Sequence, residues 1–235
     1  TCKAPELARM VFGGGTGPIT VSTLGEAETF AADGFTDMIY AVGLAPAKLP
    51  RILDLRTRGV DIAVLLDSVA QAEAVAAAAE DAGEPVPALI EIDSDGHRGG
   101  LVPGDPQIFT VAAALGANLR GVLTHAGESY FAIGREAQAA AAEGERAAVV
   151  RSAETLREAG HPCPVVSVGS TPTAHAARDL SGVTEVRAGN FIFFDLVQAG
   201  IGVCEIDDIA LSAVATVIGH RPERGWILTD GGWTA

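Results

Sequence analysis

Residues 59–93, GVDIAVLLDSVAQAEAVAAAAEDAGEPVPALIEID, contain one complete strand–helix–strand unit. The apolar runs 61–66 and 88–93 have the length and composition of strands, and the Ala-rich run 68–82 between them is typical of a helix. Strands that alternate with helices form right-handed crossover units and a parallel sheet. This stretch therefore predicts an α/β fold.

The same alternation extends in both directions along the chain. It predicts seven strands, 18–22, 37–42, 61–66, 88–93, 119–124, 164–168 and 183–187. The predicted helices are 4–12, 24–33, 46–58, 68–82, 106–115, 135–159, 173–180 and 191–199. One more strand before Thr1 would give the eight strands that close a (β/α)8 TIM barrel. An open doubly wound sheet is disfavoured because no G-x-G-x-x-G follows a first strand.

The rhythm changes after Gly200. Residues 209–220 and 226–229 are β-rich runs with no helix between them. We therefore expect residues 1–205 to form a barrel that lacks its first strand, and residues 206–235 to begin a truncated C-terminal β-rich domain. The chain opens on Thr1 and not on Met, as expected for the interior of a longer protein.

Composition narrows the possible partners. The net charge of −14 over 235 residues would repel a phosphate backbone, which argues against nucleic-acid binding. Cys2, Cys163 and Cys204 are an odd number and lack metal-ligand spacing, so we expect reduced thiols in a cytoplasmic protein. No signal peptide and no apolar run of about 18 residues is found, so no membrane association is expected.

The segment 168–173, VGSTPT, permits two interpretations. A strand that ends in Gly, two hydroxyls and a helix start can bind a phosphate. Alternatively, Ser170 or Thr171 is only the N-cap of a helix with Pro172 in its first turn. Gly189 and Asn190 follow the next predicted strand, near the close of the barrel, where such folds usually bind phosphate.

Other polar residues also follow predicted strands, at the barrel end where chemistry collects. Each has a plain structural alternative: His125 as a satisfied core histidine, Arg187 as a surface charge, Arg98 as a solvated loop residue, and Tyr130 as a cap on the core. Their convergence on one rim suits an anionic or phosphorylated ligand.

Four segments, in this order and spacing, resemble the fold-type III pyridoxal-phosphate enzymes. They are EIDSDGHRGGL (91–101), LTHAGESY (123–130), VGSTPT (168–173) and TEVRAGNFIFFDLV (184–197). The match extends over essentially the whole chain. Within that family it is to the branch of D-threonine aldolases and D-serine dehydratases, with the greatest likeness to the hydroxyaspartate dehydratase type.

The resemblance implies where the cofactor, pyridoxal 5'-phosphate, would lie. Its lysine would immediately precede Thr1; Lys3 is rejected because it would begin the following helix. Arg187 would lie beside the pyridine nitrogen, His125 against that arginine and the ring, and Arg98 near the phenolic oxygen. Tyr130 would face cofactor or substrate. The phosphate would be held by Ser170, Thr171, Gly189 and Asn190. A divalent metal, expected to be zinc, would be bound by His and Cys ligands beyond Ala235.

The implied activity is a dehydratase that converts a D-β-hydroxy amino acid, such as D-serine or D-threo-3-hydroxyaspartate, to a keto acid and ammonia. Retro-aldol cleavage to glycine and an aldehyde, a non-catalytic pyridoxal-phosphate carrier and a phosphate-binding barrel without pyridoxal are the alternatives. The resemblance also implies a homodimer.

Overall fold

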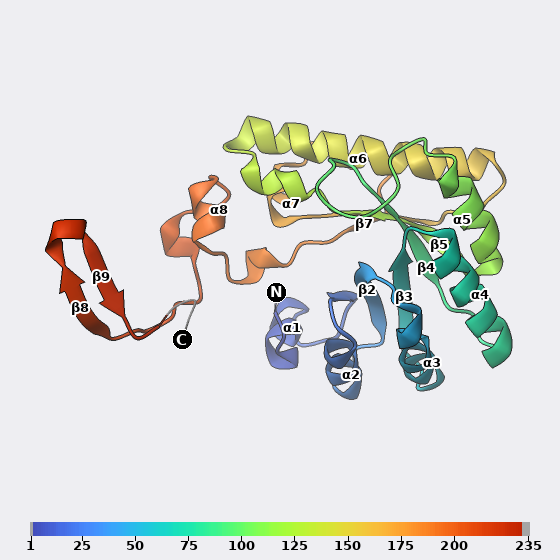
Figure 1. Cartoon of the computed structure of the whole chain (residues 1–235), viewed down its shortest axis with the longest axis horizontal. Coiled ribbons are helices and arrows are strands. Elements are labelled where there is room, and N and C mark those ends of the chain that lie inside the picture. The colour runs from blue at the N-terminus through green and yellow to red at the C-terminus, as the bar shows by residue number, and fades with distance from the viewer. Residues whose placement is uncertain (1, 232–235) are drawn as a thin grey trace.

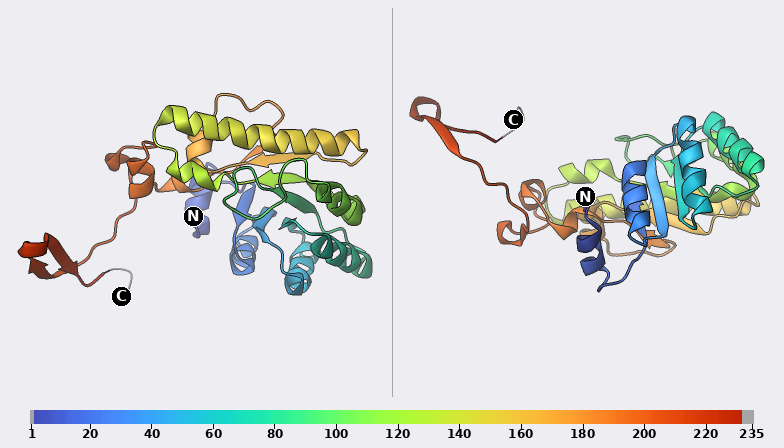
Figure 2. Two further views of the ribbon diagram at one scale, coloured as in Figure 1. Left: turned by 45° about the horizontal axis from the view of Figure 1, so that its top comes forward. Right: turned by 90° about the horizontal axis from the view of Figure 1, so that it is seen from below.

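The computed structural model describes residues 2–231. Its main sheet has seven parallel strands in sequence order, each paired with the next. They are β1 (Ile19–Val21), β2 (Asp37–Gly43), β3 (Asp61–Leu66), β4 (Ala88–Ile92), β5 (Leu119–Thr124), β6 (Val165–Val168) and β7 (Glu185–Val186). The sheet curls, with the helices outside it (Figures 1 and 2). The predicted α/β barrel class is therefore confirmed, as seven strands of a curled sheet.

Eight α-helices accompany the strands in the described residues. They are α1 (Pro5–Val11), α2 (Leu24–Ala32), α3 (Leu49–Thr57), α4 (Val69–Ala82), α5 (Gln107–Leu115), α6 (Arg135–Glu158), α7 (Thr171–Ala176) and α8 (Leu196–Gly200). Short 3-10 turns lie at 46–48, 116–118, 127–131, 190–192, 206–208 and 222–224. No helix within residues 2–231 is both long enough and apolar enough to cross a bilayer.

The strands are apolar on both faces because both faces are buried. Outward residues such as Leu66, Ile90 and Val122 pack against the helices in one large cluster. Inward residues form a second cluster, Ile39, Ala63, Leu65, Leu89 and Leu123, in the concavity of the sheet. A strand that is buried on both faces has a near-continuous apolar sequence, which explains why the strands of this sheet could be predicted.

Three predicted helices are wrong in extent. The helix expected at 46–58 is divided into a 3-10 turn at 46–48 and α3. The helix expected at 173–180 starts earlier, at Thr171, because Ser170 caps it, and ends at Ala176. The helix expected at 191–199 is divided into a 3-10 turn at 190–192 and α8. Phe194 has φ 54° between them, and the Asp195 side chain accepts a hydrogen bond from Gln198 N at 2.9 Å, which starts α8 there.

The second β-rich segment is a hairpin. Strands β8 (Val217–Arg221) and β9 (Trp226–Thr229) pair antiparallel and lie apart from the curled sheet (Figure 1). The strand predicted at 209–220 is too long, because residues 209–216 have no partner strand among residues 2–231. The division into domains 1–205 and 206–235 stays a prediction.

Candidate functional site

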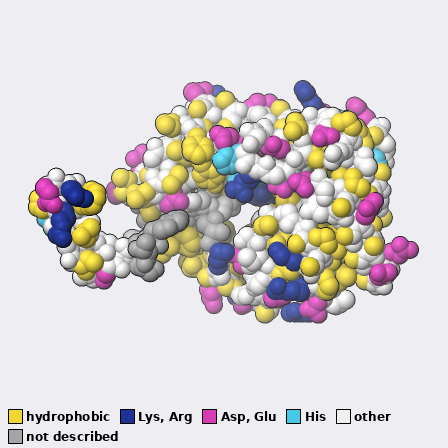
Figure 3. Space-filling model, viewed as in Figure 1, with side chains coloured by type: hydrophobic (Ala, Val, Ile, Leu, Met, Phe, Trp, Pro, Cys, Tyr) yellow, Lys and Arg dark blue, Asp and Glu magenta, His cyan; other side chains and the backbone are white. Residues whose placement is uncertain are grey.

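All eight residues predicted for the site line one cavity of about 670 Å³. They are Arg98, His125, Tyr130, Ser170, Thr171, Arg187, Gly189 and Asn190. The cavity extends from the carboxyl ends of the strands into the concavity of the sheet, where Ile39, Leu65 and Leu123 also line it. Figure 3 shows a hollow in this face of the molecule, with Lys and Arg side chains beside it. The structure therefore brings together residues that are up to 92 positions apart, Arg98 to Asn190.

Arg187 is a buried cation at the end of β7, and its side chain is only 11% exposed. Its Nε donates to Ser167 Oγ at 2.8 Å, and its guanidinium also donates to the carbonyl of Thr124. Burial lowers the pKa of Arg187, and the carboxylates of Glu185 and Glu145 act in the opposite direction. The surface-charge interpretation is wrong, since the side chain is fixed inside the rim.

His125 follows β5 and is held in its neutral form. Burial, together with the charges of Arg98 and Arg187, lowers the pKa of His125 to about 4. Its Nε2 atom is buried and has no hydrogen-bond partner within the described residues. A buried imidazole nitrogen normally has a partner, so the interpretation as a satisfied core histidine is wrong. The free nitrogen is consistent with a ligand in the cavity.

Tyr130 stacks with His125, with ring centroids 6.2 Å apart and planes 29° apart. Burial raises the pKa of Tyr130, and the positive charge of Arg98 opposes that effect. The phenol is therefore protonated at neutral pH and can donate a hydrogen bond into the cavity. Both Tyr130 and His125 come from the segment 123–130, LTHAGESY, which carries part of the family resemblance.

Ser170 is an N-cap, as the plainer interpretation of VGSTPT predicts. Its Oγ accepts a hydrogen bond from Thr173 N at 3.3 Å and lies 2.8 Å from Ser129 Oγ. Thr171 Oγ1 accepts from Asn190 N at 3.0 Å, so the two turns predicted to bind phosphate are joined to each other. The N-cap and the cavity wall are thus the same residues, and one interpretation does not exclude the other.

Gly169 is required by the close approach of two backbones. A Cβ built on Gly169 would lie 1.9 Å from the carbonyl oxygen of Arg187. No real Cβ atom tolerates such a contact, so any other residue would push the turn after β6 away from the end of β7.

Arg98 is presented by a loop that polar contacts hold in shape. Asp93 Oδ1 accepts from Gly96 N at 2.7 Å, and Asp67 Oδ2 accepts from Gly100 N at 3.0 Å. Asp95 Oδ2 accepts from Glu128 N at 2.9 Å, which ties the loop to the segment that carries Tyr130. The Arg98 side chain is exposed, as the solvated-loop interpretation predicts, and it also lines the cavity.

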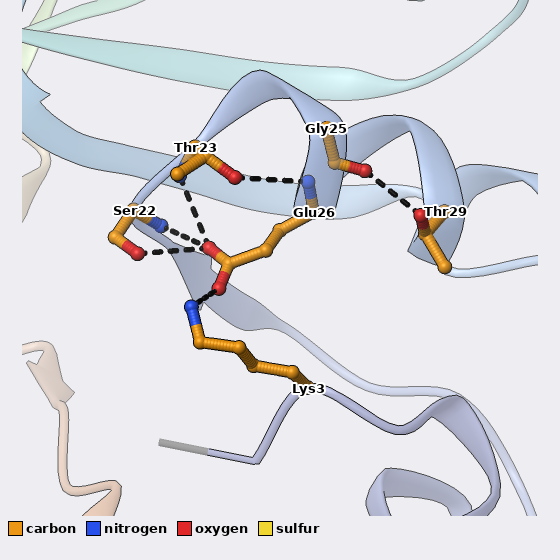
Figure 4. A network of polar contacts seen from close by, with 6 residues as sticks. All are labelled: Lys3, Ser22, Thr23, Gly25, Glu26 and Thr29. Atoms are coloured by element: carbon orange, nitrogen blue, oxygen red, sulfur yellow. Dashed lines mark hydrogen bonds and ion pairs between the residues drawn. The ribbon is translucent and has the colours of Figure 1, made fainter. Parts of the chain in front are cut away.

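Lys3 is not placed to act as the cofactor lysine. Its Nζ forms an ion pair with Glu26, as Figure 4 shows, and it does not line the cavity. The Glu26 carboxylate also accepts from Ser22 N at 2.7 Å and Thr23 N at 3.0 Å. Burial raises the pKa of Glu26, but the contact with Lys3 and the hydrogen bonds from Ser22 and Thr23 outweigh it and lower the pKa to about 2. The lysine predicted just before Thr1 lies outside the described residues.

Several carboxylates near the cavity were not predicted as site residues. Glu26, Asp37, Glu91 and Glu185 line it. Burial raises the pKa of Glu91, and the nearby charge of Asp67 raises it further. Glu145 on α6 is 3% exposed. A signal for Glu145 exists: it is spaced three and four residues from the buried Ala142 and Val149, so it interrupts the apolar stripe of a helix.

Comparison with known proteins places this curled sheet and its polar rim in a family. Residues 2–197 match the alanine racemase N-terminal domain. The chain belongs to that family, the barrel of the fold-type III pyridoxal-phosphate enzymes, as the sequence segments predicted.

Three relatives show where in that family the chain falls. It is 54% identical to D-threo-3-hydroxyaspartate dehydratase of Delftia sp. (strain HT23), over 100% of this chain and 63% of that protein. The solved structure of the Delftia enzyme matches this chain with a TM-score of 0.93 and 53% sequence identity, and the match covers 99% of this chain and 62% of that chain. D-serine dehydratase of Dictyostelium discoideum is 28% identical, over 91% of this chain and 58% of that protein. D-threonine aldolase of Arthrobacter sp. is also 28% identical, over 98% of this chain and 62% of that protein. The chain thus spans less than two thirds of the length of each.

Proposed function

We propose that the chain is the cofactor-binding barrel of a pyridoxal-phosphate- and metal-dependent lyase. The reaction proposed is the dehydration of a D-β-hydroxy amino acid, such as D-threo-3-hydroxyaspartate or D-serine, to a keto acid and ammonia. The observation that carries the proposal is the 54% identity to a D-threo-3-hydroxyaspartate dehydratase along the whole of this chain, with the rim residues inside the matched region.

Four features of the cavity fit pyridoxal phosphate. His125 Nε2 is buried and lacks a hydrogen-bond partner among residues 2–231, so this nitrogen can contact a bound ligand. The backbone at Gly169 lies against that of Arg187, and Asn190 N donates to Thr171 Oγ1, so the turn after β6 and the turn after β7 are held together. Arg98 has no ion-pair partner in residues 2–231 and supports binding of an anion in an otherwise acidic chain. The volume of about 670 Å³ suits a small cofactor and a substrate together.

When bound, pyridoxal phosphate supplies an aldehyde that joins the substrate amine and draws electrons from its Cα. The chain's own residues would hold the cofactor and orient it. Arg187 would place a fixed cation at the pyridine nitrogen, which discourages a proton there. Neutral His125 would contact the ring without adding charge. Thr171, Gly189 and Asn190, with Ser170 holding the turn, would bind the phosphate, and Arg98 would face the phenolic oxygen. Tyr130 would donate a hydrogen bond to cofactor or substrate.

The metal ligands and the lysine are proposed to come from outside residues 2–231. Within those residues, no group of three His, Cys, Asp or Glu side chains could hold a metal ion. Cys2, Cys163 and Cys204 are free thiols, and burial raises the pKa of Cys163 to about 11, so that this thiol is a poor ligand. We therefore assign no step of the reaction to a metal held by this part of the chain.

An aldolase is the second candidate, because D-threonine aldolase matches 98% of the chain. The test is to incubate the intact, metal-loaded protein with D-threo-3-hydroxyaspartate, D-serine and D-threonine. A dehydratase releases keto acid and ammonia, whereas an aldolase releases glycine and an aldehyde. Glycine and aldehyde as main products would overturn the dehydratase, and cofactor binding without any turnover would favour a carrier.

We also propose a homodimer. Large apolar side chains are exposed close to the site on adjoining segments: Phe131 (69%), Ile133 (75%) and Leu196 (72%). The segments adjoin because Gly134 N donates to Ile201 O at 3.1 Å. A monomer in light scattering would contradict this proposal.

A further inference from the structure

Glu145 is a buried carboxylate on α6 for which the proposed chemistry has no use. Its side chain is 3% exposed, and its Oε1 accepts two backbone hydrogen bonds, from Ala126 N at 2.9 Å and Gly169 N at 3.0 Å. A buried carboxylate is costly unless hydrogen bonds compensate it. These two bonds supply that compensation, and both come from turns at the rim of the cavity.

The two N–H groups lie where the sheet no longer pairs. The ladder between β5 and β6 ends at the pair Leu123 and Ser167. Beyond it, the backbones of the two turns need other acceptors. Glu145 supplies one oxygen to both, and so links the residue after His125 to the residue before Ser170. The contact of Ser129 Oγ with Ser170 Oγ at 2.8 Å is a second link between the same turns.

The position of Gly169 explains why this link matters. On one side its backbone lies against the carbonyl of Arg187, so closely that no Cβ fits, and on the other it donates to Glu145. The turn after β6 is therefore held between β7 and α6. Movement of Gly169 would change the spacing between Arg187, His125 and the start of α7 together.

We propose that Glu145 is a positioning residue that fixes the turn carrying His125 against the turn carrying Ser170 and Thr171. It acts through backbone N–H groups and does not touch the ligand. The inference rests on the proposed cofactor site for its effect on binding, but the link between the turns can be measured without cofactor.

The test compares two substitutions in the intact protein. In Glu145→Ala both N–H groups lose their acceptor. In the wild type both bonds go to one oxygen, Glu145 Oε1. In Glu145→Gln the amide oxygen can therefore still accept both bonds, while the negative charge is removed. Glu154→Gln, an exposed position on the same helix, is the control for loss of charge. Thermal unfolding with circular dichroism establishes that each variant is folded.

Two measurements decide the outcome. In amide hydrogen exchange without cofactor, Glu145→Ala should expose Ala126 and Gly169 to exchange about tenfold faster, and Glu145→Gln should stay close to wild type. In binding, Glu145→Ala should weaken affinity for pyridoxal phosphate about tenfold and affinity for pyridoxal, which lacks the phosphate, much less. Glu145→Gln should restore most of that preference.

The inference is overturned if Glu145→Ala leaves both amides protected, or if Glu145→Gln loses the preference as fully as Glu145→Ala. The latter result would assign the effect to charge and not to position. If the wild-type protein does not bind pyridoxal phosphate at all, the proposed function fails, and the exchange experiment still decides whether Glu145 links the turns.

Discussion

At the scale of single residues, the sequence predicts where His125 lies but not how burial changes its chemistry. Its position after a strand could be predicted, because the end of an apolar run is visible in the sequence. Its unpartnered Nε2 and its low pKa are properties of the folded chain, because burial lowers the pKa of His125, and Arg98 and Arg187, which are distant in sequence, lower it further.

The low pKa of His125 predicts a pH dependence of stability. The folded value is about 4 and the ordinary value is 6.5, so the unfolded chain takes up the proton first as the pH falls. Stability is unaffected above pH 6.5, falls between 6.5 and 4, and is fully reduced below 4. Between pH 7 and about pH 5, wild type should lose about 2 kcal/mol more than His125→Gln.

Urea unfolding at the two pH values measures this difference. His220→Gln, at an exposed histidine of the hairpin, is the matched control and should keep the wild-type dependence. Equal losses in wild type and His125→Gln would mean that the ring is not held neutral by its surroundings.

Gly169 gives a second prediction at this scale. Gly169→Ala should destabilise the fold by about 3 kcal/mol or more, since its Cβ would lie 1.9 Å from a carbonyl oxygen and the backbone would have to move. Gly144→Ala is the opposite case, because Gly144 lies inside α6 with open space around it and should gain about 0.5–1 kcal/mol. Chemical denaturation measures the free energy of unfolding of both variants. An unchanged stability of Gly169→Ala would show that the turn after β6 does not lie against the end of β7.

At the scale of elements, three helices begin with the same device. In α2, α4 and α7 the N-cap residue, Thr23, Ser68 or Ser170, accepts from the backbone three residues on, and a side chain there bonds back. Such caps are readable from sequence. The break at Phe194 was not, because its positive φ is fixed by the contacts of 190–195, including Asn190 Nδ2 to Asp195 Oδ2 at 2.7 Å.

The shared device allows the two interpretations of VGSTPT to be separated. Ser68→Ala and Ser170→Ala should each cost about 1 kcal/mol, as for the loss of an N-cap. Only Ser170→Ala should weaken pyridoxal phosphate, about tenfold, because Ser170 also bonds Ser129 and borders the cavity. Thermal unfolding and cofactor titration measure the two effects. If both variants bind cofactor like wild type, Ser170 is an N-cap and nothing more.

At the scale of the whole molecule, the order of the strands in the main sheet could be predicted. Whether a given apolar run finds a partner strand could not. Each strand of the curled sheet pairs with its sequence neighbour, so counting apolar runs was sufficient to place β1 to β7. The run 209–216 has the same apolar character, with Ile209, Leu211 and Val214, yet forms no ladder in the described part of the chain. Composition does not say whether a partner strand is present.

This difference predicts two levels of local stability in the 235-residue chain. β3 and β4 are buried on both faces, with Leu66, Ile90 and Leu89 fully or almost fully inaccessible. In the hairpin, Ile218, Trp226 and Ile227 are 67%, 52% and 64% exposed, and an isolated two-stranded hairpin is marginal in water. Amides of β8 and β9 should therefore exchange orders of magnitude faster than those of β3 and β4. Exchange measured by mass spectrometry tests this, and equal protection of both sheets would mean that the hairpin packs against the barrel. Slow exchange of the hairpin alone at high protein concentration would instead indicate that a second copy covers it, because only an intermolecular contact depends on concentration.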